Sequence, residues 1–211
     1  GVFRIDEGKD FYAAIPFNNL PASQDKPIII GWANDWMYAN QIPAEGSRGM
    51  FSMARKLSLR NENGVYKLNQ VPVYAESIPT QTLNLSASDL AAGKTLDMDG
   101  NAYRLNLTID LANAKGFSID LLKNEGEGTV VSYDVASQTL SFDRTKSGKV
   151  DFHEKFASVE KMKVAPKNNQ LTLDIFVDNS LVEIYANGGE KVMTQQVFPT
   201  KSKGQVLISG K

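Results

Sequence analysis

Three carboxylates near the end of the chain are the first residues whose types and spacing suit chemistry. Asp174, Asp178 and Glu183 lie close together around a predicted hairpin. Two carboxyl groups held about 5 Å apart can act as nucleophile and proton donor in a hydrolysis. The same residue types also cap turns and cover solvated strand faces. Because Asp178 precedes Asn179 in a turn signal, we expect turn capping and solvated-face roles for these carboxylates.

The other reactive residue types form no second cluster. Asp143 and Arg144 are adjacent, which indicates a structural ion pair or a turn anchor. His153 is the only histidine, and a lone histidine without partners is typical of a surface or packing position. The chain has no cysteine, and no group of residues has metal-ligand spacing. We therefore expect neither a metal nor another cofactor.

Length and charge narrow the classes of partner. The 211 residues can form one good core, or one core plus a piece of another. Lysine plus arginine number 23 and aspartate plus glutamate 24, so we expect neither nucleic acid nor a membrane surface as partner. No apolar run approaches the roughly 20 residues of a membrane helix. The chain opens in a strand-like pattern without a visible signal peptide, which suggests a fragment.

Alternation with a period of two residues recurs along the chain. Residues 105–111 place leucine and isoleucine on one face and polar residues on the other, and residues 171–177 repeat the pattern. The expected helical turn runs from Ser86 to Ala92 and ends at Gly93. Many short strands separated by turn signals such as Asn63-Gly64 predict an all-β sandwich, barrel or propeller. Shorter strands are expected at 117–121, 129–135, 140–142, 181–185 and 206–208.

The chain is expected to divide near residue 76. Residues 1–76 contain four strand candidates, which would form one four-stranded antiparallel sheet like a single propeller blade. Such a sheet is too small to be stable alone in water. Residues 77–211 are close in length to a β-sandwich domain. The four strand candidates of the first part are 11–17, 27–33, 49–59 and 65–73.

Several long motifs follow one another in this chain. The first part contains D-F-Y-A at 10–13, I-I-I-G-W-A-N-D-W-M-Y-A at 28–39 and R-G-M-F-S-M-A-R-K-L-S-L at 48–59. The second part contains S-F-D-R-T-K-S-G at 141–148, L-T-L-D-I-F-V-D-N-S-L-V-E-I-Y-A-N-G-G at 171–189 and F-P at 198–199. Together they resemble the last propeller blade and the C-terminal sandwich of glycoside hydrolase family 32, which contains levanases, inulinases and invertases. Ser47 and Ala33 depart from the tryptophan and methionine that are common there.

The resemblance implies both a fold and an activity. It implies that residues 1–76 form the last blade of a five-bladed β-propeller and residues 77–211 a concanavalin-like β-sandwich. The implied activity is hydrolysis of levan, inulin or sucrose with retention, by two carboxyl groups. The family's Trp-x-Asn-Asp-Pro, Arg-Asp-Pro and Glu-Cys motifs do not occur here, and Asn34-Asp35 is followed by Trp36. We therefore expect the catalytic residues in missing N-terminal blades, an inactive fragment, and an extracellular or periplasmic parent enzyme.

The resemblance also implies substrate-binding residues. Family enzymes place a tryptophan of the last blade at the mouth of the central pocket, and Trp32 matches it, with Trp36 as a second candidate. An indole face can stack on a sugar ring while its edge donates a hydrogen bond. The alternative is that both tryptophans pack between blades. Polar or basic neighbours could line the rim or contact the sandwich, although solvated and packing roles are the simpler reading: Asn34, Asp35, Tyr38, Arg48 and Arg55.

The sequence is compatible with three functions. The first is a fragment of a fructan hydrolase, whose sandwich stabilises the propeller. The second is a stand-alone carbohydrate-binding sandwich. The third is a scaffold that contacts the missing propeller blades or self-associates through the exposed blade, because a lone blade has two free sheet edges. The second function would need a sugar platform among phenylalanines that are more typical of a core: Phe142, Phe152, Phe156, Phe176 and Phe198.

Overall fold

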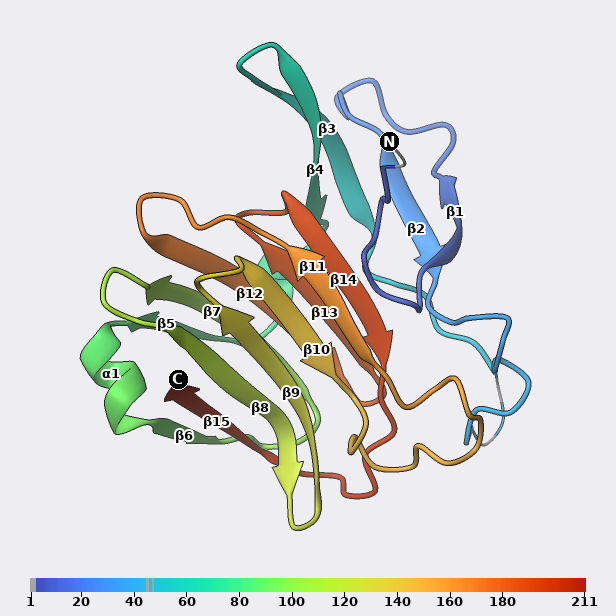
Figure 1. The fold of residues 1–211 in the computed structure, drawn as a ribbon. Coiled ribbons are helices and arrows are strands. Elements are labelled where there is room, and N and C mark those ends of the chain that lie inside the picture. Colours follow the sequence, from blue (N-terminus) through green and yellow to red (C-terminus); the bar gives the residue numbers. More distant parts are fainter. Residues whose placement is uncertain (1–2, 45, 47) are drawn as a thin grey trace.

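The chain folds into three β-sheets. A computed structural model describes residues 3–44, 46 and 48–211 (Figure 1). One sheet has four strands, and two further sheets of six and five strands pack face to face as a sandwich. Among these described residues no helix has the length and apolar character to cross a membrane. The predicted all-β class is confirmed.

The first sheet keeps the order of the sequence. Its neighbours pair antiparallel in the order β1-β2-β3-β4. Asn63 and Gly64 both have positive φ and form the tight turn between β3 and β4, as the Asn-Gly signal predicts. The predicted four-stranded antiparallel sheet is therefore present. Its strands are β1 (Tyr12–Pro16), β2 (Ile28–Trp32), β3 (Arg55–Glu62) and β4 (Val65–Pro72).

The third strand begins later than the expected residue 49. Before Arg55 the chain contacts β2 through one isolated bridge, between Trp32 and Phe51. The Gly31 amide donates to the Ser52 side-chain oxygen at 3.1 Å. This amide therefore bonds to a side chain and not to a backbone carbonyl of the neighbouring strand. A side chain at Gly31 would overlap the Phe11 ring. This irregular segment delays the regular ladder until Arg55.

The sandwich contains the other eleven strands. Strand β5 runs parallel to β7, and all other neighbours pair antiparallel. The six-stranded sheet consists of β11 (Val159–Lys163), β10 (Thr139–Asp143), β9 (Glu127–Asp134), β8 (Gly116–Asn124), β15 (Gln205–Gly210) and β6 (Lys94–Asp97). The five-stranded sheet consists of β14 (Lys191–Gln196), β13 (Leu181–Ala186), β12 (Gln170–Asp178), β7 (Ala102–Asp110) and β5 (Thr80–Leu85).

The core and the short helix follow the sequence pattern. Leu105, Leu107 and Ile109 of β7 are buried, and they form one cluster with apolar side chains of the opposite sheet. Helix α1 (Ala87–Ala92) starts with a capping box, in which Ser86 and Asp89 exchange side-chain hydrogen bonds with each other's amides. Gly93 ends it at a φ of 73°. A single 3-10 turn (Ala75–Ser77) follows the first sheet.

The alternation pattern does not predict four of the sandwich strands. These are β5, β6, β11 and β14, and each of them is the outer strand of its sheet. An outer strand pairs on one side only, so its residues need not alternate as strictly as those of a central strand. Strand β14 is mostly buried because the first part of the chain covers it.

A buried arginine joins the first sheet to the sandwich at β3. Arg55 has no exposed side-chain surface, and its guanidinium donates to Asp6 at 2.9 Å and to Glu183 at 2.9 Å. It also donates to Thr194 Oγ1 at 2.6 Å and lies 4.1 Å from the centre of the Phe11 ring. Asp6 lies before the sheet, whereas Glu183 and Thr194 belong to β13 and β14. One guanidinium therefore connects three separate parts of the chain.

A second buried arginine repeats this arrangement from the sandwich side. Arg144 donates to Asp10 at 2.6 Å and to the Tyr38 hydroxyl at 2.9 Å. The Tyr38 hydroxyl in turn donates to Asp10. The guanidinium lies 4.0 Å from the centre of the Phe156 ring, beside an aromatic cluster that Tyr38 shares with Phe156 and Phe198. This network attaches the segment after β2 to the sandwich.

Two expectations need correction here. Glu183 was expected on a solvated face or a turn, but its side chain is 2% exposed because Arg55 and the Met53 amide bind it from inside. Asp143 does anchor a turn by accepting from the Thr145 amide at 2.8 Å. Arg144, however, pairs with Asp10, which is 134 positions away, and not with its neighbour. Adjacency in the sequence gave the wrong partner.

Replacing Arg144 tests how much the second network stabilises the fold. In Arg144→Met the Asp10 carboxylate stays buried without its cation, so we expect the free energy of unfolding in urea to fall by about 3–5 kcal/mol. The double variant Asp10→Asn/Arg144→Met should recover part of this loss, because it leaves no unpaired charge. Lys203→Met, which removes the exposed pair with Asp99, is the control and should leave the free energy of unfolding unchanged. If Arg144→Met and this control have the same free energy of unfolding, Arg144 does not stabilise the fold.

Candidate functional site

The end of β2 presents the first candidate residue, Trp32. Its indole is half-buried, and the following residue is held by a hydrogen bond from the Ala33 amide to the Met50 carbonyl at 2.9 Å. A side chain at Gly49 would come within 3.4 Å of the indole nitrogen of Trp32. The absence of a side chain there keeps the N–H edge of the ring open. Trp32 thus offers both a ring face and a donor.

Trp36 extends the same surface. Its ring centre lies 4.8 Å from that of Trp32, with the planes inclined by 52°, and the residue is 66% exposed. Tyr12 of β1 meets the other side of Trp32 edge-on at 6.4 Å. We call Tyr12, Trp32 and Trp36 the aromatic surface. Three neighbouring rings of this kind can pack against the apolar faces of sugar rings.

The sequence patterns do not assign a role to Tyr12. It belongs to the D-F-Y-A motif at 10–13, together with Asp10, which binds Arg144. The motif therefore serves two purposes, because its aspartate faces the interior and its tyrosine the exposed aromatic surface. Asp10 lies before β1, and residues two positions apart in a strand share a face, so strand alternation does not account for this separation. The sequence pattern alone therefore contains no signal for the position of Tyr12.

Most of the polar side chains that could have lined the rim of a sugar pocket beside Trp32 have other roles. Asn34 is fully buried, and its side-chain oxygen accepts from the Asp35 amide at 2.9 Å. Tyr38 is 1% exposed because its hydroxyl belongs to the Arg144 network. Asp35 is half-buried and caps a turn by accepting from the Met37 amide at 2.8 Å. Arg48 donates to the carbonyls of residues 40 and 42, so it braces its own loop rather than the sandwich.

The side chains of Asp174, Asp178 and His153 form contacts that stabilise the fold. Asp174 forms a two-pronged pair with Arg104, at 2.7 and 2.8 Å. Asp178 is exposed and accepts from the Asn179 side chain at the turn, as expected. His153 accepts from the Lys155 amide through Nδ1. In the ranges that the structure describes, no three histidine, aspartate or glutamate side chains converge as metal ligands would.

The buried carboxyl groups are unsuited to attack on a sugar. Burial raises the pKa of Asp10, and Arg144 opposes this effect. Burial likewise raises the pKa of Glu183, which Arg55 lowers and the nearby Asp6 raises again. Asp6 and Glu183 share Arg55, but each side chain is only 2% exposed, so a substrate cannot reach them. Their arrangement is that of a structural charge cluster.

The phenylalanines offer no exposed platform. Phe142 and Phe156 have no exposed surface, and Phe176 and Phe198 are below 9%. Phe152 is half-buried and packs against Phe156 and Phe198 with ring centres 4.4 and 5.5 Å away. These side chains build the core and the contact between the two parts of the chain.

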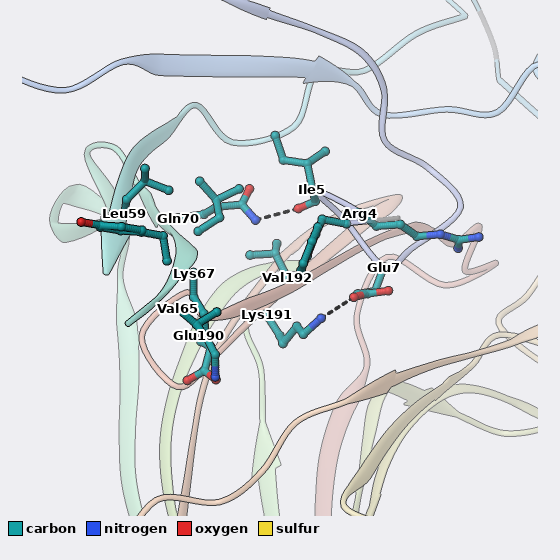
Figure 2. Close-up of a pocket in the computed structure, with 13 residues that line it drawn as sticks. Arg4, Ile5, Glu7, Leu59, Val65, Lys67, Gln70, Glu190, Lys191 and Val192 are labelled. Atoms are coloured by element: carbon teal, nitrogen blue, oxygen red, sulfur yellow. Dashed lines mark hydrogen bonds and ion pairs between the residues drawn. The ribbon is translucent and has the colours of Figure 1, made fainter. Parts of the chain in front are cut away.

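An apolar pocket of about 430 Å³ opens on another side of the first sheet (Figure 2). It lies between residues 3–7, the β3–β4 hairpin and β14. Two hydrogen bonds of 2.6 Å cross its walls, from Lys191 to Glu7 and from Gln70 to the Ile5 carbonyl. Leu59 and Tyr66 on the hairpin are 68% and 66% exposed. The hairpin therefore presents apolar side chains that nothing in the described chain covers.

Comparison with known proteins defines the class of protein. Residues 2–72 match the glycosyl hydrolases family 32 N-terminal domain, and residues 65–210 match the glycosyl hydrolases family 32 C terminal. The chain belongs to glycosyl hydrolase family 32. The four-stranded sheet is thus a propeller blade at the end of the family's N-terminal domain, and the sandwich is its C-terminal domain.

Individual relatives agree with this assignment. A levanase of Bacillus subtilis is 31% identical over 216 residues, covering 99% of this chain and 32% of the levanase. An extracellular exo-inulinase of Aspergillus niger is 35% identical over 204 residues, covering 93% of this chain and 38% of the inulinase. The crystal structure of an exo-inulinase from Aspergillus awamori superposes with a TM-score of 0.83 at 31% identity, over 98% of this chain and 41% of that one. The chain thus spans between a third and two fifths of these proteins.

The Arg55 cluster makes a prediction about pH. Two carboxylates share one guanidinium, so a proton on Glu183 relieves an excess negative charge. Because the pKa of Glu183 is raised in the folded state, the folded chain binds more protons than the unfolded chain, and stability falls as pH rises through that pKa. In Glu183→Gln the free energy of unfolding should decline less steeply as the pH rises above about 4.5, the ordinary pKa of this carboxyl group. Thr194→Val, which removes a hydrogen bond but no titrating group, should keep the wild-type slope; an unchanged slope in Glu183→Gln would contradict the proton uptake.

Proposed function

We propose that this chain is the C-terminal portion of a fructan β-fructosidase that cleaves levan, inulin or sucrose. Family membership and the similarity to a levanase and an exo-inulinase support this proposal. The observation that carries it is the contact between the half-buried ring of Trp32 and the exposed ring of Trp36, in the segment that matches the family's N-terminal domain. An extracellular or periplasmic location of the parent enzyme belongs to the same proposal and is supported by the similarity to an extracellular exo-inulinase.

The aromatic surface is proposed to bind a fructosyl unit of the substrate. The indole faces exclude water from one side of the ring, and the Trp32 N–H, which has no hydrogen-bond partner among the described residues, can donate to a hydroxyl group. Hydrolysis with retention also needs two carboxyl groups about 5 Å apart and open to the sugar. The described residues supply no such accessible pair, so we assign the nucleophile and the acid/base to the part of the enzyme outside this sequence. This chain contributes binding and orientation.

The sandwich has a proposed supporting role. Both buried arginine networks reach from the sandwich into the segments on either side of Trp32. They hold the blade in one orientation, which fixes the aromatic surface. We keep residue 76 as the proposed boundary between the two domains. The stand-alone sugar-binding reading loses its phenylalanine platform, because those side chains are buried.

The uncovered blade surface has a proposed partner in the other propeller blades. Strand β1 is exposed along its length, and Ile15, Phe51 and Leu59 are each more than 60% exposed. Propeller blades pack face to face around a central channel. These apolar side chains are therefore proposed to contact neighbouring blades, and in the isolated chain they would favour self-association.

A binding titration tests the assignment of Trp32. Addition of an inulin-type trisaccharide should change the tryptophan emission of the chain with a saturable curve. Trp32→Ala should weaken this binding by about 0.5–1.5 kcal/mol, or roughly 2- to 10-fold, because one stacking face is lost. Tyr66→Ala removes an exposed aromatic ring outside the aromatic surface and serves as the control. Equal affinities of Trp32→Ala and wild type would refute the assignment.

An activity assay tests the division of labour. The purified chain should release no fructose from levan, inulin or sucrose, because an accessible carboxyl pair is required. The measurement is reducing sugar over time against a buffer blank. Turnover that persists through a second purification step would show that the catalytic pair lies within these 211 residues.

A further inference from the structure

One glycine beside the aromatic surface is not required by the fold. The φ of Gly49 lies outside the left-handed range that favours glycine. At Gly8, Gly148 and Gly189, by contrast, a side chain would collide with backbone atoms 1.8–2.0 Å away. Apart from its chain neighbours, no described backbone atom lies within 4 Å of the place where a Cβ of Gly49 would be, and the residue is exposed. The backbone therefore leaves room for a larger residue at this position.

The space left by Gly49 lies beside the N–H edge of Trp32. An added Cβ would be 3.4 Å from Nε1 and 4.0 Å from Cδ1 of the indole, and no other described atom lies within 4 Å of it apart from the chain neighbours. The Trp32 N–H has no hydrogen-bond partner among the described residues. The missing side chain thus leaves an open space next to an unused donor. Because Gly49 is exposed, a ligand can enter this space from solvent.

Hydrogen bonds on both sides hold Gly49 in place. Arg48 donates to two carbonyls of its own loop, at 2.9 and 3.0 Å. The Met50 carbonyl accepts from the Ala33 amide at 2.9 Å, and the Ser180 hydroxyl of the sandwich donates to the Met50 sulfur at 3.1 Å. The residues before and after Gly49 are therefore fixed by the blade and by the sandwich. A ligand finds the space already formed, which lowers the cost of binding.

The donor and the space together define the chemistry of the ligand. An indole N–H donates only, so its partner has to supply an acceptor oxygen, about 2.9–3.0 Å from the nitrogen. The added Cβ would lie nearer to Nε1 than to either ring carbon bonded to it, and therefore on the outer side of the ring edge. The acceptor has to approach from that same side. A hydroxyl group on the rim of a sugar ring that stacks on the indole face meets both conditions.

We propose that Gly49 is a specificity-determining residue, whose missing side chain lets one hydroxyl group of a fructosyl ring accept from the Trp32 N–H. This inference rests on the proposed function for the identity of the sugar, and on the contacts of Gly49 and Trp32 for the place of the hydroxyl group. The indole face binds any flat apolar sugar face. The edge beside Gly49 distinguishes a ring that carries the hydroxyl group from one that lacks it.

The two indole N–H signals of the ¹⁵N-labelled chain test this directly, because the chain contains only two tryptophans. An inulin-type trisaccharide is titrated into wild type, Gly49→Ala, Trp32→Phe and the double variant. In wild type the Trp32 indole proton should move downfield along a saturable curve as it forms the hydrogen bond. Gly49→Ala should weaken binding about 3- to 10-fold, and Trp32→Phe, which keeps an apolar ring, by a similar factor. The double variant, followed by the Trp36 signal, should bind no more weakly than Trp32→Phe, because the hydrogen bond is already absent.

Stability separates a role in binding from a role in folding. Alanine at position 49 restricts the unfolded chain and meets no backbone atom, so the free energy of unfolding of Gly49→Ala should equal or exceed that of wild type. Gly128→Ala is the matched control, because its φ is also outside the left-handed range and its new methyl group meets the flexible side chain of Lys123 in the sandwich. This control should bind the trisaccharide as wild type does.

Four outcomes would overturn the proposal. The first is equal affinity of Gly49→Ala and wild type. The second is a double variant in which the two losses multiply, since Gly49 would then act independently of the N–H. The third is a fall in the stability of Gly49→Ala that accompanies its weaker binding. The fourth is a Trp32 signal that stays in place while the Trp36 signal saturates, which would leave the proposed function intact. If neither tryptophan signal changes in wild type, the proposed function itself fails, and this inference with it.

Discussion

Two buried guanidinium groups determine how this chain holds together. Arg55 and Arg144 have no exposed side-chain surface. Arg55, in the blade, binds Asp6 as well as Glu183 and Thr194 of the sandwich, and Arg144, in the sandwich, binds Asp10 and Tyr38 of the first part. Removing a charge from water is costly unless every partner is present and well placed. The arrangement therefore penalises any state in which the blade or the segment before it leaves the sandwich. A four-stranded sheet that would be marginal alone gains its stability from this attachment.

The same constraint explains where the functional surfaces lie. Asp6 and Asp10, which bind the two arginines, precede Phe11, and the Phe11 ring occupies the space over Gly31, directly before Trp32. Tyr38 is bound by Arg144 just beyond Trp36. The aromatic surface is thus held on both sides by groups anchored in the sandwich. The sandwich therefore fixes the orientation of these rings through the two arginine networks.

Local patterns in the sequence predict the local structure well. Alternation at 105–111 and 171–177, the Asn63-Gly64 turn and the Ser86 cap all appear as expected. The motifs at 10–13 and 171–189 indicate the family, because they preserve residues at fixed spacing. The four unpredicted strands are outer strands, where one-sided pairing weakens the pattern. Long-range partners were beyond reach, since Arg55 and Glu183 are 128 positions apart. Asp10, Tyr38 and Glu183 therefore read as exposed or unassigned residues, although all three are buried.

The attachment of the blade to the sandwich is the central claim, and hydrogen exchange of backbone amides tests it most directly. If the buried arginines couple the two parts, amides of β3 and β4 should exchange with the same opening free energy as those of β13 and β14. In Arg55→Met, the β3 and β4 amides should then exchange much faster while the central sandwich strands stay protected. Wild-type protein in which β3 and β4 exchange like an unfolded peptide, beside a protected sandwich, would contradict the account.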